Sequence, residues 1–214
     1  MVALAPQPIS SPTSGLILSG ISWETYQALV RELESQPSKR LIYDNGTLEI
    51  LMPLPPHESY SAWSNRLIQI ITEELDIEIR SLGSSTWTRR DLAKGIEADE
   101  CYYIQNEPLI RGRMSIDLAN DPPPDLAIEI DIISVSIPRL PIYQALGIPE
   151  VWRFDGETVT FLALNNGSYQ KIEQSIALPI VTPTLLQDWL TQATTMGETS
   201  WARAIRRWIQ THHN

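Results

Sequence analysis

The sequence predicts a single α/β domain, with α+β character, in which helices flank a mixed central β-sheet. Its 214 residues are enough for one ordinary domain with a substantial core, and 43% of them are hydrophobic. Segments with helical periodicity alternate with short β-type segments along the whole chain. No stretch is rich enough in Gly or Ser to mark a boundary between domains. We therefore expect one domain over residues 16–214.

Residues 1–15 contain three prolines and neither Lys nor Arg, so they lack the basic start and the apolar stretch of a secretory signal. We expect them to form a flexible tail. The single cysteine, Cys101, cannot form an internal disulfide, which favours the reducing environment of the cytoplasm. No apolar run approaches the roughly 20 residues that span a bilayer, so we expect no membrane contact.

The charge of the chain limits how it can bind nucleic acid. Sixteen basic residues stand against 26 acidic ones, and the net charge is −10. A negative net charge is not expected of a protein that binds DNA over its whole surface, so any DNA contact must be local. An acidic surface can also serve solubility alone, in which case it predicts no partner.

The N-terminal part is expected to hold a helix, a hairpin and a longer helix. Residues 22–35 begin at a serine that can cap a helix, and they carry an apolar stripe at helical spacing. Residues 40–52 predict a β-hairpin, because their central Asn-Gly pair tolerates the positive φ of a tight turn. Apolar residues at three- and four-residue steps then predict the longest helix over residues 57–75.

The remaining elements are predicted from helical spacing of apolar residues and from short β-type segments. Short strands are predicted at residues 77–80, 84–88 and 100–104, with a charged segment between the last two. A helix over residues 138–146 should end at Gly147. The last elements expected are strands at 149–154, 157–164 and 168–173, and helices around 183–190 and 199–209.

A row of carboxylates marks the stretch DPPPDLAIEIDII, residues 121–133. After the prolines, apolar residues alternate strictly with Asp125, Ala127, Glu129 and Asp131, so a strand carries these side chains on one face. Residues two apart on that face lie roughly 7 Å apart, which lets Glu129 and Asp131 share a magnesium or manganese ion. Asp125 is too far along the strand, and it could simply form a turn. A third ligand should come from the neighbouring strand.

We expect this third ligand to be Asp99, at the start of the 100–104 strand. It could instead belong to a solvated acidic loop. Glu129 could lie in an edge-facing charge ladder, although a buried carboxylate in mid-sheet costs several kcal/mol unless it is paired or bound to metal. Asp131 could pair with Arg139 or Arg153. These alternatives predict no metal site.

Two further segments carry weaker signals. His57 and Glu58 open the long helix, where His57 could carry a proton, but such a pair more commonly only starts a helix. The C-terminal helix 199–209 is basic and rich in Trp, so it could contact a phosphate backbone or a second subunit in a homodimer, or merely pack in the core. The sequence has no Gly-rich phosphate loop, nucleophile elbow or HExxH motif, which excludes those enzyme classes.

Several separated motifs resemble one family. They are PPPDLAIEID followed by RLPIYQALGIPEVWRFDG, and the earlier segments GISWETYQALV, GTLEILMPLPPHE and GIEADECYYI. They resemble the Uma-type restriction endonuclease family of bacteria, within the PD-(D/E)XK nuclease superfamily, over residues 16–180. The resemblance implies a restriction-endonuclease-like core.

In that superfamily an Asp and an acidic residue two positions before a Lys bind magnesium, and the Lys helps to activate the attacking water. The resemblance implies that Asp99 is the first Asp and Glu129 the second acid. Asp131 stands where the lysine would be. In many Uma-type members the lysine lies in the following helix, and the segment RLPIYQALG puts Arg139 at that position. Arginine can stabilise a developing negative charge but cannot act as a base, because it stays protonated.

The resemblance therefore implies an endonuclease that hydrolyses DNA with one or two Mg²⁺ or Mn²⁺ ions. Asp99 and Glu129 would hold the metal with Asp131, and Arg139 would face the phosphate. Two alternatives stay open. The chain could be a decayed nuclease-fold protein with a binding or regulatory role, or an interaction module that dimerises through its C-terminal helix.

Overall fold

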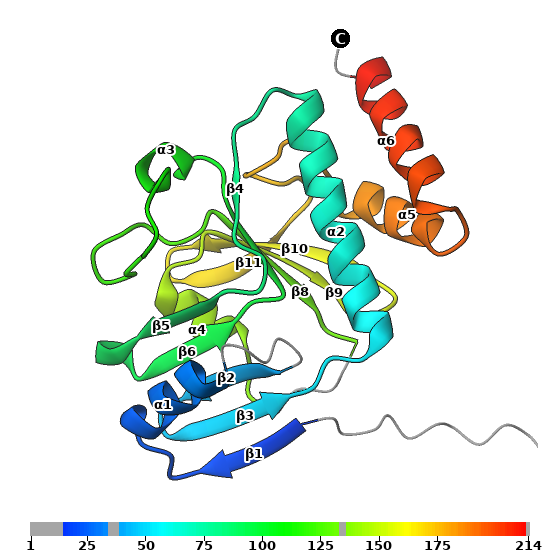
Figure 1. Ribbon diagram of the computed structural model, residues 1–214. Coiled ribbons are helices and arrows are strands. Elements are labelled where there is room, and N and C mark those ends of the chain that lie inside the picture. Colours follow the sequence, from blue (N-terminus) through cyan, green and yellow to red (C-terminus); the bar gives the residue numbers. More distant parts are fainter. Residues whose placement is uncertain (1–14, 34–38, 133–135, 213–214) are drawn as a thin grey trace, which may run out of the picture.

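The computed structural model describes residues 15–33, 39–132 and 136–212 (Figure 1). The tail expected at residues 1–15 lies outside the described residues, except for Gly15, which begins the first strand. No helix in the described part of the chain is long and apolar enough to cross a membrane.

The described strands form two sheets. The first, sheet A, is antiparallel throughout, in the order β1-β3-β2-β6-β5. Its strands are β1 Gly15–Ser19, β2 Arg40–Asp44, β3 Thr47–Leu51, β5 Thr86–Arg89 and β6 Lys94–Glu97. The second, sheet B, has the order β11-β10-β9-β8-β7-β4, and its β8–β9 pair is parallel. Its strands are β4 Arg80–Ser81, β7 Glu100–Tyr103, β8 Leu126–Ile130, β9 Glu150–Phe154, β10 Val159–Asn165 and β11 Ser168–Ile172.

The helices connect and cover these sheets. They are α1 Trp23–Leu33, α2 Pro55–Glu74, the 3₁₀ turn η1 Arg90–Leu92, α3 Glu107–Ile110, α4 Leu140–Leu146, α5 Pro183–Ala193 and α6 Glu198–His212. The predicted long helix is α2, and α4 ends as expected at Gly147, whose φ of 76° is left-handed. The prediction of a mixed sheet flanked by helices is thus confirmed in sheet B, and sheet A is a second sheet that the sequence did not reveal.

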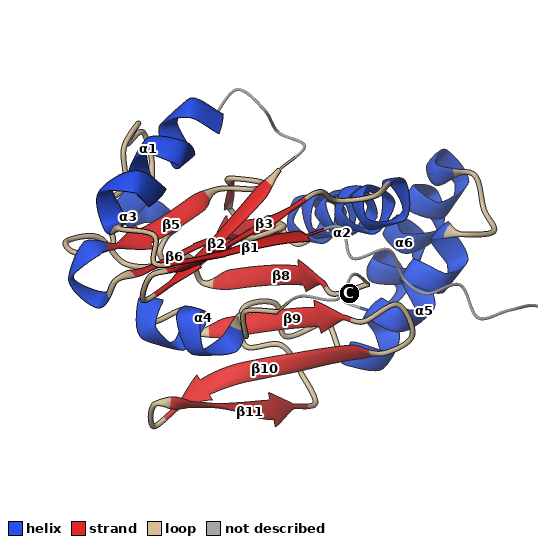
Figure 2. Cartoon of the chain, turned by 90° about the horizontal axis from the view of Figure 1, so that it is seen from below, coloured by secondary structure: helices blue, strands red, loops and turns tan. Residues whose placement is uncertain are grey.

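Sheet B is covered on both faces. One apolar cluster joins α2, α5 and α6 to Ile128, Trp152 and their neighbours, and another joins α4 and sheet A to Ala127 and Val151. Figure 2 shows α4 and the helices α2, α5 and α6 on different sides of β8 and β9. Every residue of β8 is buried, so both of its faces lie in the core. One face belongs to the first cluster and the other face to the second.

The sequence predictions differ from the structure at five short elements. Strands β1 and β6, helix α3 and the turn η1 were not predicted, and of the strand predicted at residues 77–80 only Arg80 lies in a strand, β4. Strand β6 was interpreted as a charged loop because its sequence, KGIE, has no apolar run. It is a strand because β2 and β5 pair with it from both sides. Tertiary pairing has here overridden a weak local preference.

Candidate functional site

The predicted carboxylates meet where the chain passes from sheet A to sheet B. Strand β6 ends at Glu97 and β7 begins at Glu100, so Asp99 lies in the short connection between the sheets. The β7–β8 register pairs Glu100 with Ile128, which places Asp99 beside the end of β8. There the backbone N–H of Ile130 donates a 2.8 Å hydrogen bond to Oδ2 of Asp99. Asp99, just before β7, and Glu129 of β8 are therefore neighbours.

The two carboxylates also converge on one group. Glu129 shares a face of β8 with Ala127, which belongs to the cluster between sheet B, α4 and sheet A. Asp99 lies just outside β7, and Nη1 of Arg139 reaches both carboxylates. Glu129 lies on a central strand and is 1% exposed, which excludes the edge-facing charge ladder.

Arg139, the residue before α4, places its guanidinium among these carboxylates. Its Nη1 forms an ion pair with Oε2 of Glu129 and lies 3.7 Å from Oδ2 of Asp99 and 3.5 Å from Oδ1 of Asp131. The other oxygen of Glu129, Oε1, accepts a hydrogen bond from the hydroxyl of Tyr143 in α4. One helix thus supplies both partners of Glu129.

Asp131 has a second and better-formed partner. Arg153 of β9 donates to Oδ2 of Asp131 from Nε at 2.7 Å, and its Nη2 lies 2.6 Å from the same oxygen. Both arginine pairs considered from the sequence are therefore present, with Arg139 and with Arg153. A carboxylate held in this way is oriented rather than solvated.

His57 and Glu58 lie at the same site. Nε2 of His57 is 3.1 Å from Oδ1 of Asp99, and its Nδ1 is 3.4 Å from the carboxylate of Glu58. Arg40 of β2 approaches from sheet A, with Nε 3.9 Å from Oδ1 of Asp99. The first turn of α2 thus contacts the carboxylate at the sheet junction.

Asp125 lies away from this group, at the opposite end of β8. Its Oδ2 accepts hydrogen bonds from the backbone N–H groups of Ile104, at 2.7 Å, and Asn106, at 2.9 Å. The side chain closes the turn after β7, which agrees with its interpretation as a turn-former.

Three site residues were missed by sequence reasoning. Tyr143 could have been found, because it lies four residues after Arg139 and so faces the same side of a helix. Arg40 and Glu49 gave no local signal, since both lie in a hairpin with apolar neighbours. Glu49 is buried, and it accepts hydrogen bonds from the backbone N–H of Ser136 and Ile137, which fixes the chain just before Arg139.

Burial and charge shift the titration of the carboxylates in different directions. Burial, with the nearby carboxylates of Asp99 and Asp131, raises the pKa of Glu129 well above its ordinary value. Burial likewise raises the pKa of Asp131. Burial opposes ionisation of Asp99 too, but the contact with His57 and the charge of Arg139 hold its pKa below the ordinary value. Glu129 is thus the carboxylate whose ionisation depends most on a nearby cation.

The donor set fits a hard divalent cation in its chemistry. Three carboxylates face one point, and three of their buried oxygens, Oδ1 of Asp99, Oε2 of Glu129 and Oδ1 of Asp131, have no hydrogen-bond partner among the described residues. Nη1 of Arg139 occupies that point. Within the described ranges, no group of three or more His, Cys, Asp and Glu side chains has an arrangement ready to hold a metal ion. The carboxylates could hold a cation only with the guanidinium moved aside.

The carboxylates border a cavity of about 380 Å³, which Glu129, Asp131, Arg139, Tyr143 and Arg153 line together with Pro138, Leu140 and Pro141. This volume lies within the usual range for ligand sites. Because its wall contains the charged groups, the cavity is the natural route for a ligand to the site.

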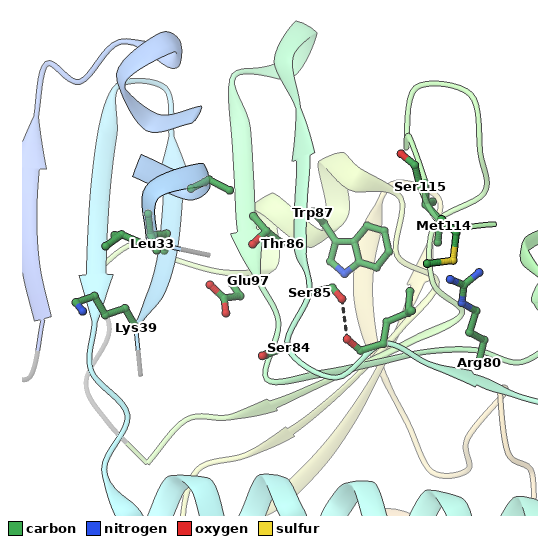
Figure 3. A pocket seen from close by; sticks show the side chains of 14 residues that line it. Leu33, Lys39, Arg80, Ser84, Ser85, Thr86, Trp87, Glu97, Met114 and Ser115 are labelled. Atoms are coloured by element: carbon green, nitrogen blue, oxygen red, sulfur yellow. Dashed lines mark hydrogen bonds between the residues drawn. The ribbon is translucent and has the colours of Figure 1, made fainter. Parts of the chain in front are cut away.

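A larger cavity of about 540 Å³ lies elsewhere, and neither Asp99 nor Glu129 lines it. Figure 3 shows it with Lys39 at one end and Arg80 at the other. Glu97 lies in its wall and approaches Nη1 of Arg40 at 3.3 Å. We assign the site to the smaller cavity, because volume alone brings no reactive groups together.

Comparisons with known proteins identify one family for most of the chain. A family model with the description "Uma2: Putative restriction endonuclease" matches residues 23–194. A solved structure of a "putative nuclease belonging to DUF820" from Anabaena variabilis ATCC 29413 is similar, with 16% identity and a TM-score of 0.46. That match covers 70% of this chain and 90% of the other. No curated protein matches the chain.

Proposed function

Because this chain belongs to the Uma2 family, we propose that it is a metal-dependent endonuclease that hydrolyses DNA phosphodiester bonds at the site of Asp99 and Glu129. One observation carries this proposal. Asp99, just before β7, and Glu129, in the adjacent strand β8, approach the same guanidinium. Such convergence is what a shared cation requires.

Asp99, Glu129 and Asp131 would hold one or two Mg²⁺ or Mn²⁺ ions. A bound divalent cation supplies a more acidic water and neutralises charge on the phosphate. The chain's own residues orient these ligands: His57 contacts Asp99, and the Tyr143 hydroxyl donates to Glu129.

Arg139 would contribute positive charge toward the scissile phosphate. It cannot replace the lysine of the superfamily as a base, because a guanidinium remains protonated. Its planar group can instead hold two phosphate oxygens and stabilise charge that develops on them. Arg153, which lines the same cavity, adds a second positive charge where a DNA strand would pass. Two arginines at one cavity would keep any DNA contact local on a chain of net charge −10.

The test is plasmid nicking by the full chain and by Glu129→Gln in Mg²⁺ and in Mn²⁺. We expect the substitution to abolish metal-dependent nicking while far-UV circular dichroism stays unchanged. Glu173→Gln, an exposed carboxylate just after the edge strand β11, should nick like the wild type. Equal nicking by Glu129→Gln and the wild type would reject the assignment.

A second candidate function is a nuclease-fold protein that no longer cleaves. Two observations favour it: Asp131 stands at the lysine position, and Arg139 lies where a cation would bind. This candidate predicts no nicking by the wild type at any metal concentration, and DNA binding that does not change when metal is added. A metal-dependent change in either measurement excludes it.

A further inference from the structure

Arg139 makes an unusual contact for an arginine. Its Nη1 alone faces three carboxylates, those of Asp99, Glu129 and Asp131. Neither its Nε nor its Nη1 has a hydrogen-bond partner among the described residues, so these contacts are ion pairs. Arg153, by contrast, uses two nitrogens on Asp131. Arginine usually gains its advantage over a point charge from such forked geometry. Arg139 therefore acts here as a compact cation.

Three carboxylates crowded in one buried layer repel one another unless a cation lies among them. A divalent ion and the Arg139 guanidinium would use the same oxygens, because Nη1 stands at the point that Glu129 Oε2 and Asp131 Oδ1 share. The two cations cannot occupy that point together. Either cation, the metal ion or the guanidinium, neutralises the negative charge of the three carboxylates when it is present.

We propose that Asp99, Glu129 and Asp131 form one cation site with two alternative occupants, the Arg139 guanidinium and a divalent metal ion. The metal enters only when the Arg139 side chain leaves. The metal half of this inference rests on the proposed function, whereas the self-neutralised state follows from the contacts of Arg139.

The displaced side chain has a place to go. The cavity of about 380 Å³ next to the carboxylates is lined by Arg139 itself and by Pro138, Leu140 and Pro141. A phosphodiester in this cavity would attract the guanidinium away from the carboxylates. DNA and metal should then favour each other's binding, because the DNA phosphate stabilises the arginine in the position that leaves the cation site open.

The experiment is titration of Mn²⁺, followed by calorimetry, into the metal-free full chain and two variants. Arg139→Gln removes the internal occupant and should bind Mn²⁺ at least about tenfold more tightly than the wild type, a change of roughly 1.4 kcal/mol. Arg203→Gln is the matched control, because it removes one positive charge from the exposed face of α6 without touching the three carboxylates. It should change Mn²⁺ affinity less than about threefold.

Equal gains in the two variants, or no gain in Arg139→Gln, overturn the proposal. A measurement on the unaltered protein covers the case in which Arg139→Gln does not fold. A short DNA duplex with non-hydrolysable linkages should tighten Mn²⁺ binding by the wild type about fivefold or more. Mn²⁺ affinity that is unaffected by this DNA would also overturn it.

The outcome is separable from the proposed function. Tighter Mn²⁺ binding by Arg139→Gln without nicking by any variant supports the exchange and rejects the nuclease. Nicking by the wild type, together with unchanged Mn²⁺ affinity in Arg139→Gln, supports the nuclease and rejects the exchange.

Discussion

Nε2 of His57, in the first turn of α2, lies 3.1 Å from Oδ1 of Asp99, at the junction of the two sheets. The other oxygen of Asp99 accepts a hydrogen bond from the Ile130 backbone. Asp99 is therefore held from two sides by elements far apart in the sequence. A carboxylate held in this way keeps its orientation without needing solvent.

His57→Ala should lower the free energy of unfolding by about 1–3 kcal/mol, because the buried carboxylate of Asp99 loses its 3.1 Å contact with the imidazole. Urea unfolding in the presence of a chelator measures this loss. His212→Ala, at the exposed end of α6, should change the free energy by less than about 0.5 kcal/mol. Equal effects of the two substitutions would contradict a specific role for His57 at Asp99.

Tyr143→Phe removes the hydroxyl that donates to Glu129. Tyr169→Phe is a matched control, since it removes a hydroxyl that donates 2.7 Å to the carbonyl of Ile148. Both variants should lose about 1 kcal/mol of stability in urea unfolding. Only Tyr143→Phe should weaken Mn²⁺ binding, because only its hydroxyl orients a proposed ligand. A similar loss of Mn²⁺ affinity in both variants would show that the effect is not local.

The buried carboxyl group of Glu100 should make the free energy of unfolding depend on pH. Burial raises its pKa from 4.5 to about 7, against hydrogen bonds from Ser61 and Tyr102 that favour the ionised form. Between these two values the folded state binds the proton more tightly than the unfolded state, so stability falls as pH rises. Glu100→Gln cannot ionise and should escape this loss.

In urea unfolding with a chelator, Glu100→Gln should exceed the wild type by on the order of 2 kcal/mol at about pH 8. The difference should shrink toward zero near about pH 4.5, where the wild-type side chain is protonated in the folded state. A difference that is the same at both pH values would show that Glu100 ionises as easily in the folded chain as in water.

Gly95 is the point of closest approach between β6 and α1. A Cβ atom built there would lie 2.2 Å from the hydroxyl oxygen of Tyr26, whose ring is fully buried. Gly95→Ala should therefore destabilise the chain by about 1–3 kcal/mol. In a Tyr26→Leu background, where the ring is absent, the same substitution should cost clearly less in thermal or urea unfolding. An unchanged cost would mean that the clash is with the backbone rather than the ring.

Local patterns were sufficient for most elements and for the candidate carboxylates. Strict alternation after three prolines predicted β8 with Glu129 and Asp131 on one face, and helical spacing before Gly147 predicted α4. The approach of Asp99 to Glu129 could also be anticipated, since the strand predicted to begin at residue 100 was the expected neighbour of the strand that carries Glu129. Such signals depend on residues close together in the chain, so they can be interpreted without the fold.

Tertiary packing alone decided the surroundings of those carboxylates. Arg40 reaches Asp99 from β2, and His57 reaches it from the start of α2, because two sheets meet at the β6–β7 connection. The spacing of Arg139 indicated that it belongs near the site, but only the packing of α4 against sheet B puts its guanidinium among three carboxylates. The reason is physical: the energy of a buried charge depends on every group around it, and those groups come from distant parts of the chain.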